Sequence, residues 1–287
     1  MKVLIVGCMG MLGSDLMARF GLCHQVRGVD QQEMDITRPE QCLEQIQDFR
    51  PDAVINAAAL TKVDYCESNE REAFLVHGEG AGNLAKAAAA CGALLVHYST
   101  DYVFDGQKMG AYLEEDAPNP QSVYGKSKLL GEELVRRQCS DHLILRTSWL
   151  FGRNGRNFIR TIVDLARKGT PLRVVNDQRG SPSYSEDVAS HTLRMVEAGC
   201  RSTYHLTNSG FCTWYDLAVK ALECMGIEGV PITPVSTLEF PRPAPRPANS
   251  VLANCRLERD GVPPLRPWQG AVREYIERHL LKKYIPD

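Results

Sequence analysis

Tyr124 and Lys128 are the two residues whose types and spacing most directly suggest chemistry. Both lie in the segment QSVYGKSKLLGEELVRR, where Ser122 is a suitable N-cap for a helix that begins at Val123. At 100° per residue, Lys128 projects about 40° from Tyr124, one turn along the same helix face, and Lys126 projects about 200° away. A cation beside a tyrosine favours the phenolate and lowers the pKa of its hydroxyl toward the working range. The spacing therefore predicts that Tyr124 is a general acid with Lys128 as its partner.

Neighbouring residues separate the two lysines of this segment. The face shared by Tyr124 and Lys128 also carries Gly131 and Val135, whereas the face of Lys126 carries further charged residues. We therefore expect Lys126 to be solvated and Lys128 to be buried, where a lysine usually has a specific reason to lie. The pair suits protonation of an oxygen that gains negative charge as hydride reaches its carbon, and the ammonium can also bind the ribose hydroxyls of a nicotinamide coenzyme. Because Tyr-x-x-x-Lys is common by chance, the interpretation depends on the rest of the chain.

A hydroxyl residue precedes this helix at the end of a predicted strand. The run ALLVHYST, residues 93–100, is typical of a buried strand and ends in Ser99 and Thr100. Ligands bind at the carboxyl ends of strands in open parallel sheets, so the Thr100 hydroxyl can donate to a substrate oxygen and stabilise developing charge. The alternative for Thr100 is a turn or cap. His97, inside the strand, is expected to be a core residue.

A glycine-rich turn near the start of the chain predicts a dinucleotide site. Residues 2–7, KVLIVG, form a short apolar run that leads directly into GCMGMLG. Glycines between a strand and a helix allow a tight turn, a close approach to a pyrophosphate, and amide N–H groups aimed at it. The alternative is a turn with a purely structural role. The expected coenzyme contacts are Gly7, Gly10, Met11, Leu12 and Gly13.

Residues after the second and third strands bear on the choice of coenzyme. Asp30 ends the predicted strand at 25–30 and can accept hydrogen bonds from the adenosine ribose, which favours NADH over NADPH. A 2′-phosphate needs a nearby cation, and the close candidate is Arg27, which we expect to be a solvated surface charge. Asp35 and Ile36 can contact the adenine, although Asp35 can equally be a turn residue. Small residues at the end of the third predicted strand leave room for the coenzyme across the sheet edge, although these alanines can equally serve helix packing. The remaining predicted coenzyme residues are Ala57, Ala58, Ala59 and Thr61.

Strands and helices alternate along the first half of the chain. Apolar runs predict strands at 2–7, 25–30, 52–59, 93–100 and 142–148, with helices at 12–20, 39–49, 70–91 and 123–139. This alternation predicts an α/β fold with a doubly wound parallel sheet of the Rossmann type. Residues 1–150 are expected to form an NAD(P)-binding domain. Residues 151–287 are expected to form mainly a smaller α/β substrate-binding region, with some segments returning to the first domain.

The second half of the chain has a looser pattern. The segment PITPVSTLEFPRPAPRPANSVL is too rich in proline for a regular helix and is expected to be extended or loop-like. Long loops in compact proteins are often functional. The predicted helices of this half span 157–168, 185–197, 213–225 and 268–283.

Composition excludes several classes of function. The chain has 287 residues, a net charge of −2 and 44% hydrophobic residues, as in ordinary globular proteins. It has no basic run suited to nucleic acid and no apolar stretch of about 18 residues for a membrane span, and the run in MKVLIVG is too short for a secretion signal. The ten cysteines form no C-x-x-C pair or zinc-type ladder. We therefore expect reduced thiols, no metal and a cytoplasmic location.

Six motifs together resemble one known family. In chain order they are GCMGMLG, NAAALTKVDYCE, STDYVFDG, VYGKSKLLGE, RTSWLFG and RPANSVL. They resemble the extended short-chain dehydrogenase/reductase superfamily, and within it most closely the dTDP-4-dehydrorhamnose reductases. The match covers nearly the whole chain, and STDYVFDG and RTSWLFG are far more specific than the glycine turn. The resemblance implies reduction of the 4-keto group of dTDP-4-dehydro-L-rhamnose to dTDP-L-rhamnose by hydride transfer from NADH or NADPH.

The resemblance also implies roles for single residues. Tyr124 matches the proton donor, Lys128 its partner and Thr100 the third catalytic hydroxyl. Trp149 is expected to pack against the sugar or the nicotinamide. On the pattern alone, Arg246 is a solvated charge in the proline-rich loop. The residues implied to contact the sugar nucleotide are Thr100, Asp101, Tyr102, Trp149, Arg246 and Ser250.

This sequence departs from the family pattern at a few positions. His77 stands where the family has asparagine, Met11 where it commonly has glutamine, and Ala253 where it usually has aspartate. These differences bear on the substrate more than on the chemistry. Some family members hold Mg²⁺ between carboxylates at a dimer interface, but no such cluster can be mapped here, so no metal is expected.

Two other functions stay open at this point. One is a non-catalytic NAD(P)-binding regulatory subunit, as in a relative of this family that serves methionine adenosyltransferase. The other is a reductase or epimerase of another sugar nucleotide. The intact set of Thr100, Tyr124 and Lys128 favours an enzyme, because a pure binder need not keep an acid. We expect a monomer or homodimer whose partner is a small sugar nucleotide.

Overall fold

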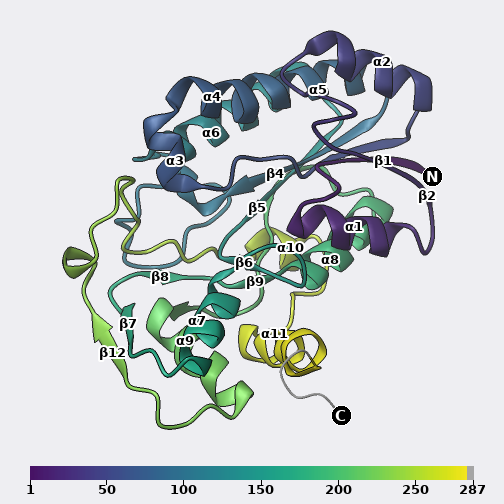
Figure 1. Ribbon diagram of the computed structural model, residues 1–287. Helices are drawn as coiled ribbons and strands as arrows, with labels where there is room; N and C mark the ends of the chain where they lie inside the picture. Colours follow the sequence, from purple (N-terminus) through teal and green to yellow (C-terminus); the bar gives the residue numbers. More distant parts are fainter. Residues whose placement is uncertain (283–287) are drawn as a thin grey trace.

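Six parallel strands form the central sheet of the computed structural model, which describes residues 1–282 (Figure 1). The strands are β1 (Lys2–Val6), β2 (Gln25–Val29), β3 (Ala53–Asn56), β4 (Leu94–Thr100), β5 (His142–Thr147) and β10 (Ser202–His205). Their order is β10–β5–β4–β3–β1–β2, and each neighbouring pair is parallel. The chain moves to β2 on one side of β1 and to β3 on the other. The ligand crevice of such a sheet therefore lies at the carboxyl ends of β1 and β3.

Helices cover both faces of this sheet. On one face lie α1 (Met11–Phe20) and α8 (Ser185–Glu197), and on the other lie α2 (Pro39–Phe49), α5 (Gly80–Ala90) and α6 (Val123–Gln138). Alternate residues of β1 serve the two cores: Val3 and Ile5 pack with α1 and α8, whereas Leu4 and Val6 pack with α2 and α5. Burial on both faces explains the continuous apolar strand runs. The predicted doubly wound parallel sheet is confirmed.

The helix predicted over 70–91 differs from expectation. It is divided into α4 (Glu70–Phe74), the π-helical turn η1 (Leu75–Glu79) and α5. Gly78 lies within this turn, and a Cβ there would lie 2.5 Å from a methyl carbon of Leu130 on α6. Glycine lowers helix propensity and here permits close packing on the neighbouring helix. Single π-turns inside helices often occur at functional sites.

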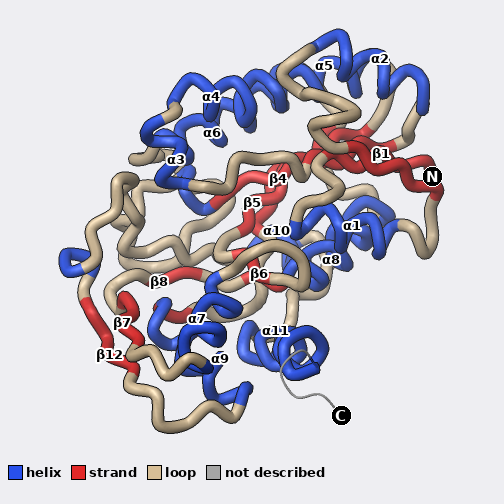
Figure 2. Tube along the Cα trace, in the orientation of Figure 1, coloured by secondary structure: helices blue, strands red, loops and turns tan. Residues whose placement is uncertain are grey.

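A smaller unit follows the sheet. It contains α7 (Phe158–Arg167), β7 (Leu172–Val175), α9 (Trp214–Met225), β12 (Ile232–Val235), α11 (Trp268–Tyr275) and the π-helical η4 (Ile276–Leu281). The proline-dense segment, residues 231–252, begins with β12, continues through one 3₁₀ turn and is otherwise mostly loop, which agrees with the prediction of an extended or loop-like segment (Figure 2). The helix predicted over 268–283 runs through α11 and η4, and Lys283 lies outside the described residues.

Short elements complete the described chain. They are α3 (Val63–Ser68), the 3₁₀ turns η2 (Asp101–Val103) and η3 (Thr237–Glu239), α10 (Cys255–Arg259), and the two-residue strands β6 (Leu150–Phe151), β8 (Arg179–Gly180), β9 (Ser183–Tyr184) and β11 (Cys212–Thr213). The segment comprising α8 and β10 returns to the large sheet, because α8 packs on α1 and β10 pairs with β5. The domain division at residue 150 stays a prediction.

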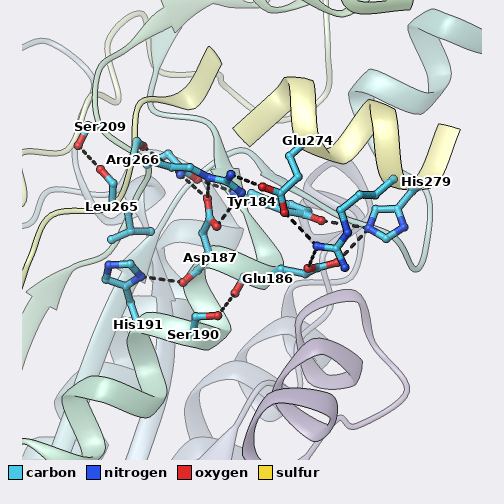
Figure 3. A network of polar contacts seen from close by, with 12 residues as sticks. Tyr184, Glu186, Asp187, Ser190, His191, Ser209, Leu265, Arg266, Glu274 and His279 are labelled. Atoms are coloured by element: carbon cyan, nitrogen blue, oxygen red, sulfur yellow. Dashed lines mark hydrogen bonds and ion pairs between the residues drawn. The ribbon is translucent and has the colours of Figure 1, made fainter. Parts of the chain in front are cut away.

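An ion-pair network joins the start of α8 to the C-terminal helices (Figure 3). The Arg266 guanidinium donates to both carboxylate oxygens of Asp187 at 2.8 and 2.9 Å and also pairs with Glu274 on α11. Nε2 of His279 on η4 lies within hydrogen-bond distance, 2.9 Å, of the Glu186 carboxylate. These contacts fix the smaller unit against the helix layer of the large sheet.

Candidate active site

The glycine turn between β1 and α1 is so tight that it leaves no room for a side chain at Gly7 or Gly13. Gly7 has φ +77°, and a Cβ there would lie 2.7 Å from the backbone nitrogen of Ala58. A Cβ at Gly13 would lie 2.0 Å from the carbonyl oxygen of Gly7. Any side chain at either position would therefore displace the backbone. The turn brings the start of α1 close to the end of β3, as a pyrophosphate-binding turn needs.

A cavity of about 220 Å³ opens beside this turn. The predicted coenzyme residues that line it are Gly7, Gly10, Asp30, Asp35, Ile36, Ala57, Ala58 and Ala59. Other predicted contacts lie elsewhere. Leu12 is buried in the core under the sheet, Gly13 packs on Gly7, Thr61 is exposed, and Met11 points toward the loop at Gly152. The glycines, the carboxylates after β2 and the small residues after β3 thus meet at one crevice, although they come from three segments.

Asp30 lies in this crevice directly after β2. Its carboxylate accepts hydrogen bonds from the backbone N–H of Met9 at 3.0 Å and of Gln31 at 2.9 Å. Arg27 is a surface charge, as predicted, and it pairs with the exposed Asp48 at 2.7 Å and covers the ring of Phe49. The negative Asp30 is therefore held at the cavity, whereas Arg27 is engaged elsewhere.

The prediction that Lys128 is buried and Lys126 is solvated is confirmed. The Ser122 hydroxyl caps α6 by accepting from the N–H of Gly125 at 3.0 Å. Lys128 is 3% exposed, whereas Lys126 is exposed to solvent. The Lys128 ammonium donates to the carbonyl oxygen of Tyr98 at 2.5 Å. The end of β4 therefore holds this lysine beneath the site.

The prediction that Lys128 lowers the pKa of Tyr124 is wrong for this structure. Burial raises the pKa of the phenol, the Asp101 carboxylate raises it further, and the Thr100 hydroxyl beside it acts in the opposite direction. The Lys128 ammonium is bound to a carbonyl, and burial lowers its own pKa to about 8. Tyr124 is therefore protonated at neutral pH and able to donate its proton.

Thr100 and the residues after it surround the phenol. The Thr100 hydroxyl donates to the Asp101 carboxylate at 2.9 Å and accepts from the N–H of Tyr102 at 3.2 Å. The ring of Tyr102 meets the ring of Tyr124 edge to face at 5.5 Å. Burial raises the pKa of Asp101 to about 6, against the lowering effect of the Ser250 and Thr100 hydroxyls. The structure thus gathers most of the predicted catalytic and sugar-binding residues at the carboxyl end of β4.

Trp149 and Arg246 each contact another residue of the chain. Trp149 has φ +44° and stacks on Trp214, with ring centroids 3.5 Å apart. A positive φ in a tryptophan is a strained conformation that the surroundings must hold in place. Arg246 is ion-paired with Asp64 at 2.9 Å rather than solvated as the pattern alone predicted. This pair ties the proline-rich loop to α3, next to Tyr102.

Comparison with known proteins identifies the family. The RmlD substrate binding domain family matches residues 1–281. The chain belongs to this family. The resemblance stated from the motifs is thereby confirmed.

Relatives of this RmlD family member share its length and fold. The dTDP-4-dehydrorhamnose reductase of Burkholderia thailandensis is 39% identical over 289 residues, covering 95% of this chain and 97% of the relative. The crystal structure of the Clostridium acetobutylicum dTDP-4-dehydrorhamnose reductase has 41% identity and a TM-score of 0.94, covering 96% of this chain and 99% of that one. The Bacillus anthracis dTDP-4-dehydrorhamnose reductase, solved in complex with NADP, has 34% identity and a TM-score of 0.94, covering 96% and 98%.

One buried group beside the RmlD-family site escaped sequence reasoning. The Glu132 carboxylate is fully buried and accepts two hydrogen bonds from the buried Arg146 guanidinium, both at 2.8 Å. It also accepts one from Arg136 at 2.6 Å. Glu132 lies one turn after Lys128 on the same helix face, so its burial could have been predicted. Its pairing with Arg146 on β5 could not be read from the sequence.

Among residues 1–282, no group of three or more His, Cys, Asp and Glu side chains is arranged to hold a metal ion. Over the same residues, every helix is too short or too polar to span a bilayer. All ten cysteines carry free thiols.

Proposed function

We propose that this protein reduces the 4-keto group of dTDP-4-dehydro-L-rhamnose with NADH or NADPH and yields dTDP-L-rhamnose. Membership of the RmlD family and the named activity of its close relatives support the substrate class. The observation that carries the reaction is the placement of a protonated Tyr124 hydroxyl beside Thr100, at the carboxyl end of the strand adjacent to the coenzyme crevice. A purely coenzyme-binding protein would not need that hydroxyl.

The lining of the cavity suits the pyrophosphate and the adenosine ribose of a dinucleotide, because it combines a glycine turn with no room for a Cβ and a carboxylate that can bind ribose hydroxyls. When bound, the reduced nicotinamide supplies the hydride that reaches the carbonyl carbon. Tyr124 transfers its proton to the carbonyl oxygen as charge develops. The Thr100 hydroxyl donates to the same oxygen after its hydrogen turns away from the Asp101 carboxylate. The Lys128 ammonium, held at the Tyr98 carbonyl, is assigned to the ribose hydroxyls of the coenzyme, and a proton from water restores the phenol.

A substrate panel tests the proposal. The protein is mixed with several dTDP-linked and UDP-linked 4-keto sugars and with NADH or NADPH, and the loss of the reduced nicotinamide absorbance is followed. We expect the largest kcat/KM with dTDP-4-dehydro-L-rhamnose. A larger value with another sugar would reassign the substrate. Tight coenzyme binding without turnover on any sugar would favour a regulatory coenzyme-binding subunit instead.

NADH is expected to support the reaction at least as well as NADPH, because the Asp30 carboxylate repels a 2′-phosphate and Arg27 is paired with Asp48. Asp30→Asn keeps an acceptor for the Met9 N–H and removes the charge. We expect it to raise the NADPH/NADH ratio of kcat/KM by about fivefold, the effect of about 1 kcal/mol between unit charges about 4 Å apart in water. Side-by-side kinetics measure the ratio. A strong NADPH preference in the unaltered protein would refute the assigned role of Asp30.

The cellular setting is also a proposal. Ten free thiols suit a reducing compartment, which supports a cytoplasmic location. We further propose that the protein acts on a free sugar nucleotide as a monomer or homodimer. Light scattering coupled to size exclusion measures the oligomeric state.

A further inference from the structure

A buried histidine connects the coenzyme cavity to the helix that carries Tyr124. His77 is 1% exposed and lies on the π-helical turn η1. Its Nε2 accepts a hydrogen bond from the backbone N–H of Leu60 at 2.9 Å, and Leu60 lines the cavity. Its Nδ1 lies 2.8 Å from the Ser127 hydroxyl, which donates to the carbonyl oxygen of Tyr124 at 2.9 Å.

The partners determine which ring nitrogen of His77 carries the proton. The Leu60 amide can only donate, so Nε2 must accept. Nδ1 therefore carries the hydrogen and donates to Ser127, whose own hydrogen is used toward Tyr124. Burial lowers the pKa of His77 to about 3, and the nearby Lys128 charge adds to this. One neutral tautomer satisfies every hydrogen bond of the chain from Leu60 to Tyr124.

Packing fixes the imidazole as well as its hydrogen bonds. The ring meets the ring of Tyr124 edge to face, with centroids 5.4 Å apart and an interplanar angle of 89°. A Cβ on Gly131 of α6 would lie 2.3 Å from the carbonyl oxygen of His77, so the turn and the helix approach as closely as glycine allows. The imidazole therefore contacts the Tyr124 ring directly and its backbone through Ser127.

We propose that His77 is a positioning residue that holds Tyr124 in register with the coenzyme cavity through the chain Leu60–His77–Ser127–Tyr124. The inference rests on the proposed reductase function. His77 touches neither substrate nor coenzyme in this account. It fixes the position of Tyr124 through Ser127 and the position of Leu60 in the cavity wall through its other ring nitrogen. The distance between the phenol and the coenzyme cavity is thereby held constant.

Two isosteric variants separate the two links. In His77→Asn, the amide N–H replaces Nδ1–H and keeps the bond to Ser127, but the acceptor for Leu60 is lost. In His77→Gln, the amide oxygen replaces Nε2 and keeps the Leu60 bond, but the donor to Ser127 is lost. We expect His77→Gln to lower kcat about 10-fold with little change in coenzyme Kd. We expect His77→Asn to keep kcat within about threefold and to weaken coenzyme binding about threefold or more.

A double-mutant cycle tests whether His77 acts through Ser127. Ser127→Ala should lower kcat about as much as His77→Gln, and the double variant should lower it no further. Losses of kcat that add fully in the double variant would rule out the proposed series of hydrogen bonds. Equal kcat in His77→Gln and the unaltered protein would rule it out as well. His205→Gln alters another fully buried histidine, which meets the Ala253 carbonyl, and serves as the control for loss of stability without loss of kcat.

A spectroscopic measurement separates this inference from the proposed reaction. The ¹⁵N shifts of His77 in the protein without coenzyme should report a neutral Nδ1–H ring from about pH 5 to 9, with that hydrogen protected from exchange and the protection lost in Ser127→Ala. An Nε2–H tautomer, or a ring that protonates near pH 6.5, would overturn the inference. If no sugar nucleotide is reduced, the proposed function fails. These spectra then still decide whether the hydrogen bonds from Leu60 through His77 and Ser127 to Tyr124 exist.

Discussion

Tyr124→Phe is expected to lower kcat by about 10²-fold or more, the usual cost of losing a general acid, and to leave coenzyme Kd within about twofold. The phenol is protonated at neutral pH because burial and the Asp101 carboxylate raise its pKa. Phenylalanine keeps the ring contacts with His77 and Tyr102 while removing only the hydroxyl. Steady-state kinetics and coenzyme fluorescence titration measure the two quantities.

Tyr98→Phe is the matched control for this substitution. The Tyr98 hydroxyl lies on the same strand as Thr100 but bonds to Thr192 in the core, 2.6 Å away. Its loss should reduce stability modestly and leave kcat unchanged. Full turnover in Tyr124→Phe would remove Tyr124 from the mechanism. An equal fall of kcat in both variants would point to a general loss of structure.

Glu132→Gln is expected to destabilise the fold by about 3–5 kcal/mol, because it leaves the buried Arg146 guanidinium without its counter-charge. Urea unfolding at pH 7 measures the change. Glu223→Gln breaks an ion pair with Lys220 on the surface of α9 and should leave the unfolding midpoint nearly unchanged. Equal stability of Glu132→Gln and the unaltered protein would contradict the role assigned to the buried pair.

The same carboxylate makes stability depend on pH. Burial alone would raise the pKa of Glu132, but the Arg146 hydrogen bonds and the charges of Arg146 and Arg136 lower it to about 2. Since the unfolded value is about 4.3, Glu132 contributes stability above that pH and loses it as the pH falls toward 2. In Glu132→Gln, the fall in unfolding free energy across this acid range should be smaller. An unchanged slope would contradict the lowered pKa.

The parts of the site that follow local rules were predictable. The backbone approaches so closely at Gly7 and Gly13 that only glycine fits there. The turn could therefore be predicted from the spacing of the glycines alone. The burial of Lys128 followed from helical geometry alone. The parallel sheet followed from strands buried on both faces, as the alternate packing of β1 shows.

What depends on pairing between distant segments was not predictable. The partner of Glu132 is Arg146 on β5, and the partner of Arg246 is Asp64 on α3. The sign of the pKa shift of Tyr124 was wrong because its desolvation depends on everything packed around it, whereas the sequence showed only the nearby lysine. His77 was visible only as a departure from the family pattern, and its hydrogen bonds join three segments.

Transfer of deuterium from the coenzyme to the sugar decides whether the protein is a reductase that uses Tyr124 as its acid. NADH carrying deuterium at both C4 positions of the nicotinamide is mixed with dTDP-4-dehydro-L-rhamnose and the unaltered protein, and the sugar product is analysed by mass spectrometry and NMR. We expect dTDP-L-rhamnose with the label at C4 of the sugar, formed in step with coenzyme oxidation and nearly abolished in Tyr124→Phe. An unlabelled product, or bound coenzyme that stays reduced in the presence of the sugar, would contradict it.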